Sequence, residues 1–89
     1  PTHFAVALQY DPKTMGAPTV TAKGQDETAL RMRRIAGDAE VPVIENKPLA
    51  RAIYAEVEVG EQIPEKFYEA MVIVLREVYR MTGKKVMYG

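Results

Sequence analysis

Cysteine is absent from all 89 residues of the chain, and this absence narrows the possible folds more than any other feature. A small domain without disulfides or zinc–thiolate sites must be held together by its hydrophobic core. A chain of this length is expected to form one domain that buries roughly 60–65% of its unfolded surface, which leaves little margin. The absence of cysteine also excludes a cysteine nucleophile.

The charges of the chain balance, with 12 basic and 12 acidic residues. This balance argues against bulk electrostatic binding, so we expect no nucleic-acid partner. A local patch formed by Arg31, Arg33 and Arg34 keeps a small nucleic-acid-binding α/β domain open as an alternative, although a solvated helix face explains this cluster better. The longest apolar run, at 70–75, has six residues, whereas a membrane-spanning helix needs about 20.

Three short segments predict β-strands, because they are rich in apolar and β-branched residues: 4–8, 19–22 and 41–45. The first has no polar alternation, which is typical of a strand buried on both faces. Lys23 and Gly24 are expected to end the second strand in a turn, since the glycine spacing of a phosphate-binding loop is missing there.

Helices are predicted between and after these strands. Asp26 is the expected N-cap of the first helix, and Pro48 fits the first turn of a short helix over 48–54. The longest helix is expected to open at Pro64. Its core-facing stripe is predicted to consist of Phe67, Met71, Val74, Leu75 and Val78.

Together these elements predict an α/β fold, in which helices flank a small mixed sheet. The order strand, helix, strand over 19–45 suggests a right-handed parallel crossover. We expect a single domain over 1–83 followed by a tail at 84–89. Three short strands make a thin sheet, and a strand preceding Pro1 would complete it.

The chain offers few groups for catalysis. His3 is the only histidine, which excludes a multi-histidine metal site, and the sequence contains no serine. Thr2 and His3 could pair as nucleophile and base, but no orienting carboxylate lies near them in the sequence. We therefore expect no metal, no cofactor and no turnover of a diffusible substrate.

Pro1, Thr2 and His3, followed directly by a strand, resemble the Asn-Pro-Thr-His signature of the FlhB/YscU family without its asparagine. This family comprises the switch proteins of flagellar and injectisome type III export. Further similar stretches follow in the family's order: 17–18, 22–24, 41–46, 48–52, 63–64 and the final helix. The stretches 22–24 and 56–60 are similar to the flagellar rather than the injectisome type.

The resemblance implies a membrane-anchored N-terminal half and a cytoplasmic domain that cuts itself between asparagine and proline. This chain would then be the C-terminal product, a single-turnover product rather than an enzyme, and the strand upstream of the cut would stay in the sheet. The cut would switch export from rod and hook subunits to filament subunits, at the cytoplasmic face of the bacterial inner membrane at the flagellar base.

The resemblance also implies the partners of the chain. These are the upstream fragment, export substrates, the hook-length ruler protein and other components of the export apparatus. By similarity, the substrates would bind an apolar patch formed by Ala17, Pro18, Val72 and Leu75. A valine at position 72 replaces the alanine expected there.

Overall fold

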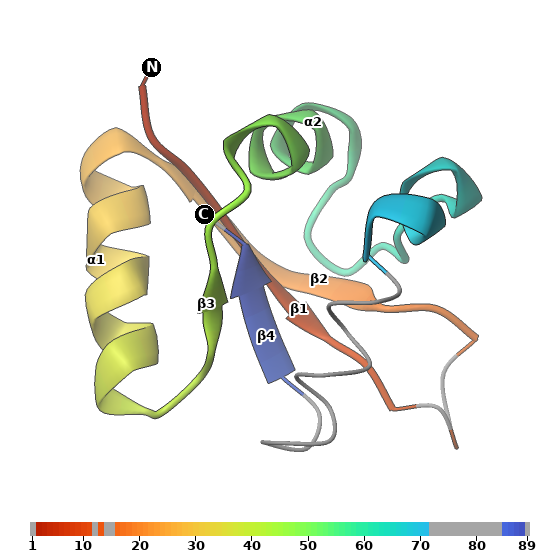
Figure 1. Cartoon of the computed structure of the whole chain (residues 1–89), viewed down its shortest axis with the longest axis horizontal. Coiled ribbons are helices and arrows are strands. Elements are labelled where there is room, and N and C mark those ends of the chain that lie inside the picture. Colours follow the sequence, from red (N-terminus) through yellow and green to blue (C-terminus); the bar gives the residue numbers. More distant parts are fainter. Residues whose placement is uncertain (1, 12, 14–15, 72–84, 89) are drawn as a thin grey trace.

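The computed structural model describes residues 2–11, 13, 16–71 and 85–88, which form a four-stranded sheet flanked by helices (Figure 1). The strands are β1 (Phe4–Gln9), β2 (Thr19–Gln25), β3 (Val43–Ile44) and β4 (Lys85–Tyr88). The helical elements are α1 (Asp26–Asp38), α2 (Lys47–Glu56) and the 3₁₀ turn η1 (Glu65–Phe67).

The strands lie in the order β2-β1-β4-β3. Strand β1 is antiparallel to both of its neighbours, and β3 is parallel to β4. The predicted α/β fold with a mixed sheet is therefore confirmed. Strands β2 and β3, which precede and follow α1 in the sequence, run in the same direction but lie at opposite edges of the sheet. The crossover through α1 thus spans the whole sheet instead of joining neighbours.

The prediction of a tail at 84–89 was wrong for Lys85–Tyr88. These four residues form β4, which lies between β1 and β3 in the sheet. Met87 and Tyr88 are only 2% and 0% exposed. Four residues are too few to predict a strand from local preference. The segment forms a strand because it pairs through its backbone with β1 on one side and with β3 on the other. The strand that completes the sheet of this chain is therefore β4, between β1 and β3, and not a segment preceding Pro1.

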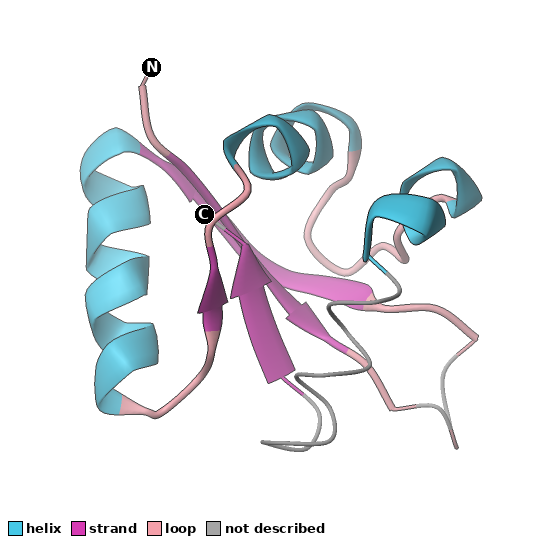
Figure 2. Ribbon diagram, in the orientation of Figure 1, coloured by secondary structure: helices cyan, strands magenta, loops and turns pink. Residues whose placement is uncertain are grey.

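The helices α1 and α2 lie on opposite sides of the sheet (Figure 2), and the core accordingly has two parts, one on each face. Side chains alternate along β1, so Val6 and Leu8 pack with Ile53 of α2, whereas Ala5 packs with Ala29 and Ala36 of α1. The prediction that this strand is buried on both faces is confirmed. The small residues facing α1 allow that helix to lie close to the sheet.

The other predicted elements differ from the observed ones mainly in their bounds. Asn46 caps α2, since its side-chain oxygen accepts a hydrogen bond of 3.1 Å from the amide of Leu49. The third strand has two residues instead of five. Phe67 and Met71 are buried as predicted, and helical residues follow η1 from 68 to 71. The rest of the predicted stripe (Val74, Leu75 and Val78) lies outside the described residues.

The hydroxyl of Tyr88 is buried and has no hydrogen-bond partner in the part of the chain that the structure describes. Burial disfavours the charged phenolate and raises the pKa of Tyr88 to about 12 from 10.0. The folded state therefore binds the phenol proton more tightly than the unfolded state does.

This raised pKa predicts an alkaline loss of stability. The contribution of the neutral phenol is complete below pH 10, where both states are protonated, and it is lost as the pH rises from 10 to about 12. Equilibrium denaturation of the chain at several alkaline pH values should show this decline. Tyr88→Phe should remove most of it, whereas Tyr68→Phe, at an exposed position, should leave it in place.

Candidate functional site

The segment before β1 is attached to the start of α1 through Asp26. The backbone amides of Thr2 and His3 donate hydrogen bonds of 2.9 and 3.2 Å to Oδ1 of Asp26. The amide of Asp26 in turn donates a bond of 2.8 Å to the carbonyl oxygen of His3. Asp26 therefore binds Thr2 through its side chain and His3 through both its side chain and its backbone.

Asp26 has this role because of its backbone conformation. Its φ angle of +48° lies in the left-handed region, which aspartate tolerates better than most residues. The prediction that Asp26 caps α1 was wrong: Gln25 holds the cap position, and the Asp26 carboxylate accepts from Thr2 and His3. These hydrogen bonds lower the pKa of Asp26 below 3.8. We therefore expect the attachment of the segment to persist above pH 3.8 and to weaken as acid protonates the carboxylate.

Thr2 and His3 also contact each other, with 3.0 Å between Oγ1 of Thr2 and Nδ1 of His3. Folding brings a carboxylate that is distant in sequence to this pair, since Oδ1 of Asp26 lies 3.5 Å from the same Thr2 hydroxyl. The carboxylate thus meets the hydroxyl rather than the imidazole. In a catalytic triad the carboxylate orients the histidine instead, so this geometry fits the holding of a peptide segment better than a nucleophile–base pair.

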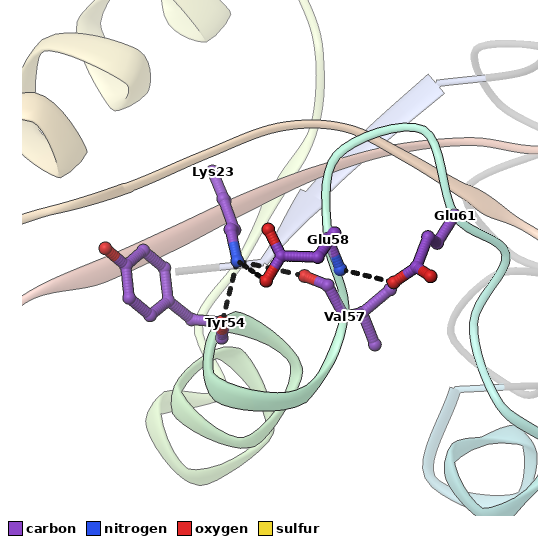
Figure 3. Close-up of polar contacts among 5 residues, drawn as sticks. All are labelled: Lys23, Tyr54, Val57, Glu58 and Glu61. Carbon is purple, nitrogen blue, oxygen red and sulfur yellow. Dashed lines mark hydrogen bonds and ion pairs between the residues drawn. The ribbon is translucent and has the colours of Figure 1, made fainter.

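Lys23 forms a second cluster, on the other face of the sheet (Figure 3). Its ammonium group donates hydrogen bonds of 3.1 Å to the carbonyl oxygens of Tyr54 and Val57 and lies 3.4 Å from Oε1 of Glu58. It also lies 5.0 Å from the centre of the Tyr54 ring. The side chain is only 18% exposed. Lys23 therefore satisfies carbonyl groups at the end of α2, where a cation also suits the helix dipole.

The expectation of a turn at Lys23 and Gly24 was wrong, since β2 continues through both. A bulge explains the direction of their side chains. The register passes from the pair Leu8–Val20 to the pair Ala7–Ala22, which leaves Thr21 as an extra residue. The alternation is thereby inverted, and Lys23 lies opposite Val6 on the face that packs with α2.

Gly24 lies opposite Ala5 and points toward α1. A Cβ at this position would lie 2.5 Å from Cγ2 of Thr28 and 3.0 Å from Sδ of Met32. Only glycine therefore allows the first turn of α1 to lie this close to β2. Within the motif at 22–24, Lys23 therefore contacts the end of α2 and Gly24 packs against α1.

The apolar patch implied for substrate binding is only partly within the described residues. Ala17 is 3% exposed, and Pro18 is also buried. The carbonyl oxygen of Pro18 accepts a bond of 2.8 Å from the amide of Ile63, so the two residues support the segment that follows α2. Val72 and Leu75 lie outside the described residues, and the patch stays a prediction.

The basic cluster lies on α1, where Arg31 and Arg34 are exposed. Arg33 is 3.4 Å from Oε1 of Glu45, and an acidic partner of this kind is typical of a solvated helix face. Nothing in this arrangement tests the nucleic-acid alternative. Among the described residues there is no group of three or more acidic or histidine side chains that could hold a metal ion. The helices within the same residues are too short or too polar to cross a membrane.

Comparison with known proteins identifies the family. Residues 1–78 match the model of the FlhB HrpN YscU SpaS family. The chain belongs to this family. It is 50% identical over 78 residues to the flagellar biosynthetic protein FlhB of Treponema pallidum, covering 88% of this chain and 21% of that protein. It is 45% identical over 84 residues to FlhB of Bacillus subtilis, covering 94% of this chain and 23% of that protein.

Solved structures of family members have the same fold. The C-terminal domain of PscU matches with a TM-score of 0.81 and 40% identity, covering 86% of this chain and 98% of that domain. A mutated C-terminal domain of EscU/SpaS matches with a TM-score of 0.85 and 33% identity, covering 91% and 100%. The chain thus spans less than a quarter of the length of these two curated relatives and nearly the whole of these C-terminal domains. These comparisons support a component of the flagellar type III export apparatus.

Sequence patterns did not predict the roles of Asp26 and Lys23. The local sequence predicts a cap at Asp26 and a turn at Lys23, because cap and turn preferences depend only on neighbouring residues. The contacts that define their roles reach across 23 to 35 positions of the chain. A lysine directly after the β-branched segment 19–22 was the available signal for a partly buried, paired cation.

Proposed function

We propose that this chain is the C-terminal part of a flagellar export switch that cuts itself at the peptide bond preceding Pro1. The uncut protein would export rod and hook subunits, and the cut protein would export filament subunits. The observation that carries the proposal is the binding of Thr2 and His3 by Asp26, in a chain that matches the family model over residues 1–78.

The proposed reaction uses the asparagine expected before Pro1. Its side-chain nitrogen attacks its own backbone carbonyl carbon, a succinimide ring forms, and the bond to the Pro1 nitrogen breaks. The amide proton is lost as the Pro1 nitrogen gains one, through solvent or through His3. Asp26 would contribute by position, since the bonds to Thr2 and His3 fix the segment that carries the leaving nitrogen.

The position of this segment also suggests how a cut could be recognised. Thr2 and His3 are exposed, and they directly precede β1, which lies inside the sheet. Cleavage would change the surface near Thr2 and His3 while the buried residues of β1 keep the core closed. Export substrates, a hook-length ruler protein and other apparatus components are the proposed readers of this surface, at the cytoplasmic face of the inner membrane.

The proposal is tested by the mass of the protein extended upstream through its natural sequence. Under denaturing conditions we expect two fragments, one of which starts at Pro1, and a single chain when the preceding asparagine is replaced by alanine. A single uncut chain from both proteins would contradict self-cleavage. It would leave the family membership unaffected.

The role of Asp26 predicts an effect on the rate of this cleavage. In the extended protein, Asp26→Ala should slow cleavage roughly tenfold, because the amides of Thr2 and His3 lose their shared acceptor and the turn samples more conformations. Asp26→Asn, which keeps an amide oxygen, should have a smaller effect. Glu27→Gln alters the next, exposed acidic side chain and serves as the control. Equal rates in all four proteins, followed by intact mass over time, would exclude a positioning role.

A further inference from the structure

The place of β4 in the sheet has a consequence for any strand that precedes Pro1. β2 pairs with β1 along its full length, from Phe4 opposite Gln25 to Gln9 opposite Thr19. The other edge of β1 pairs with β4 from Val6 to Gln9. Since a strand has only two edges for hydrogen bonding, both edges of β1 are used in this chain.

A strand directly upstream of Pro1 would join β1 through a short turn. Strands connected in this way are antiparallel neighbours. Such a strand can reach β1 only at the edge where β4 lies, because β2 holds the other edge from the first residue to the last. It would also run in the direction of β4, which is antiparallel to β1 and parallel to β3.

The fit of β4 in this place is incomplete. It is four residues long, and among the described residues its pairing with β1 covers only Val6 to Gln9 and does not extend to Phe4 and Ala5. The hydroxyl of Tyr88 is enclosed in the core without a hydrogen-bond partner among the described residues, and a buried polar group of this kind is destabilising. An upstream strand of six or more residues would have the length to pair with all of β1.

We infer that the position between β1 and β3 is an exchangeable strand site. Its occupant in the extended protein is the strand directly upstream of Pro1, and Lys85–Tyr88 takes its place when that strand is absent. The two segments exclude each other. This inference rests on the proposed function, in which the chain continues upstream of Pro1, and on the strand that the family resemblance implies there. The C-terminal residues would then close the sheet of the released chain and cover an edge that otherwise invites aggregation.

Amide hydrogen exchange tests the exclusion directly. The amide of Met87 donates a bond of 3.0 Å to the carbonyl of Pro42, and the amide of Val20 donates one of 3.0 Å to the carbonyl of Glu61. In the 89-residue chain both should exchange slowly. In the extended protein the Met87 amide should exchange at least 100-fold faster (on the order of a lost protecting bond), whereas the Val20 amide should stay protected.

The extended protein for this test carries alanine in place of the asparagine before Pro1. It contains the upstream strand whether or not self-cleavage exists, so a failure of the proposed reaction does not affect the result. Protection of Met87 in both proteins would overturn the inference, because β4 would then keep its place beside the upstream strand. Rapid exchange of Met87 in the short chain would overturn it as well.

Tyr88→Phe gives a second readout. Removal of the unpartnered hydroxyl should raise the midpoint of thermal unfolding of the short chain by about 5 °C. It should leave the extended protein unchanged, because Tyr88 is displaced there. Tyr68→Phe, at a position that is 39% exposed, is the matched control and should change neither protein. An equal rise in both proteins would contradict the exchange.

Discussion

Replacement of Lys23 by methionine is expected to lower the free energy of unfolding by about 2 kcal/mol. Methionine keeps the apolar stem of the side chain but removes the ammonium group. The carbonyl oxygens of Tyr54 and Val57, each 3.1 Å from that group, then lose a charged donor at the end of α2. Hydrogen bonds to charged groups are stronger than those between neutral groups. The two bonds of the Lys23 ammonium group are also largely shielded from water, since the side chain is only 18% exposed.

The matched control for this variant is Glu58→Gln, which removes the other charge of the cluster. Glu58 is 75% exposed on its side chain and lies 3.4 Å from the ammonium group. Exposed ion pairs contribute little, so the expected loss is below about 0.5 kcal/mol. Urea denaturation of the three proteins measures both values. If Lys23→Met and Glu58→Gln lowered the free energy of unfolding equally, the ion pair and not the carbonyl contacts would account for the contribution of Lys23 to stability.

Replacement of Gly24 by valine is expected to destabilise the fold by about 2 kcal/mol. The added Cβ would lie 2.5 Å from Cγ2 of Thr28 and 3.0 Å from Sδ of Met32, both on α1. The helix or its side chains must then move away from β2, and the layer that contains Ala29 and Ala36 loses contact with the sheet. Valine otherwise suits a strand, so a loss of stability would report this close approach.

Gly37→Ala is the control that distinguishes a steric clash at position 24 from a general destabilisation when glycine is replaced by a larger residue. Gly37 lies within α1, and a Cβ there meets nothing within 4 Å. The variant should gain about 0.5–1 kcal/mol, because alanine favours the helix. Thr28→Ala should also recover part of the loss when it is combined with Gly24→Val. Chemical denaturation of the single and double variants would contradict the packing argument if Gly24→Val proved neutral or if Thr28→Ala gave no recovery.

Local sequence patterns were sufficient for much of the fold. The apolar run that forms β1 predicted a strand buried on both faces, and Pro48 predicted the first turn of α2. These predictions succeeded because each depends on a few neighbouring residues whose preferences agree with their final surroundings. The residues that resemble the FlhB/YscU signature also led to the correct family.

The errors fell where distant residues decide the structure. Lys85–Tyr88 has no strong pattern of its own, and it is a strand because β1 and β3 lie on either side of it. The sequence around Asp26 predicts a helix cap, whereas in the structure its carboxylate accepts a hydrogen bond from the amide of His3. The bulge at Thr21 could not be read from a strand's alternation, although it turns Lys23 toward α2.

The amino-acid sequence by itself determined the α/β class, the approximate positions of the first strand and of the helices α1 and α2, and the family of this protein. Tertiary structure alone decided which segment completes the sheet, which carboxylate holds Thr2 and His3, and which helix Lys23 caps. The physical reason is the range of the forces involved. Helix and strand preferences act between near neighbours in the chain, whereas hydrogen bonds and close packing between elements exist only after folding has brought distant residues together.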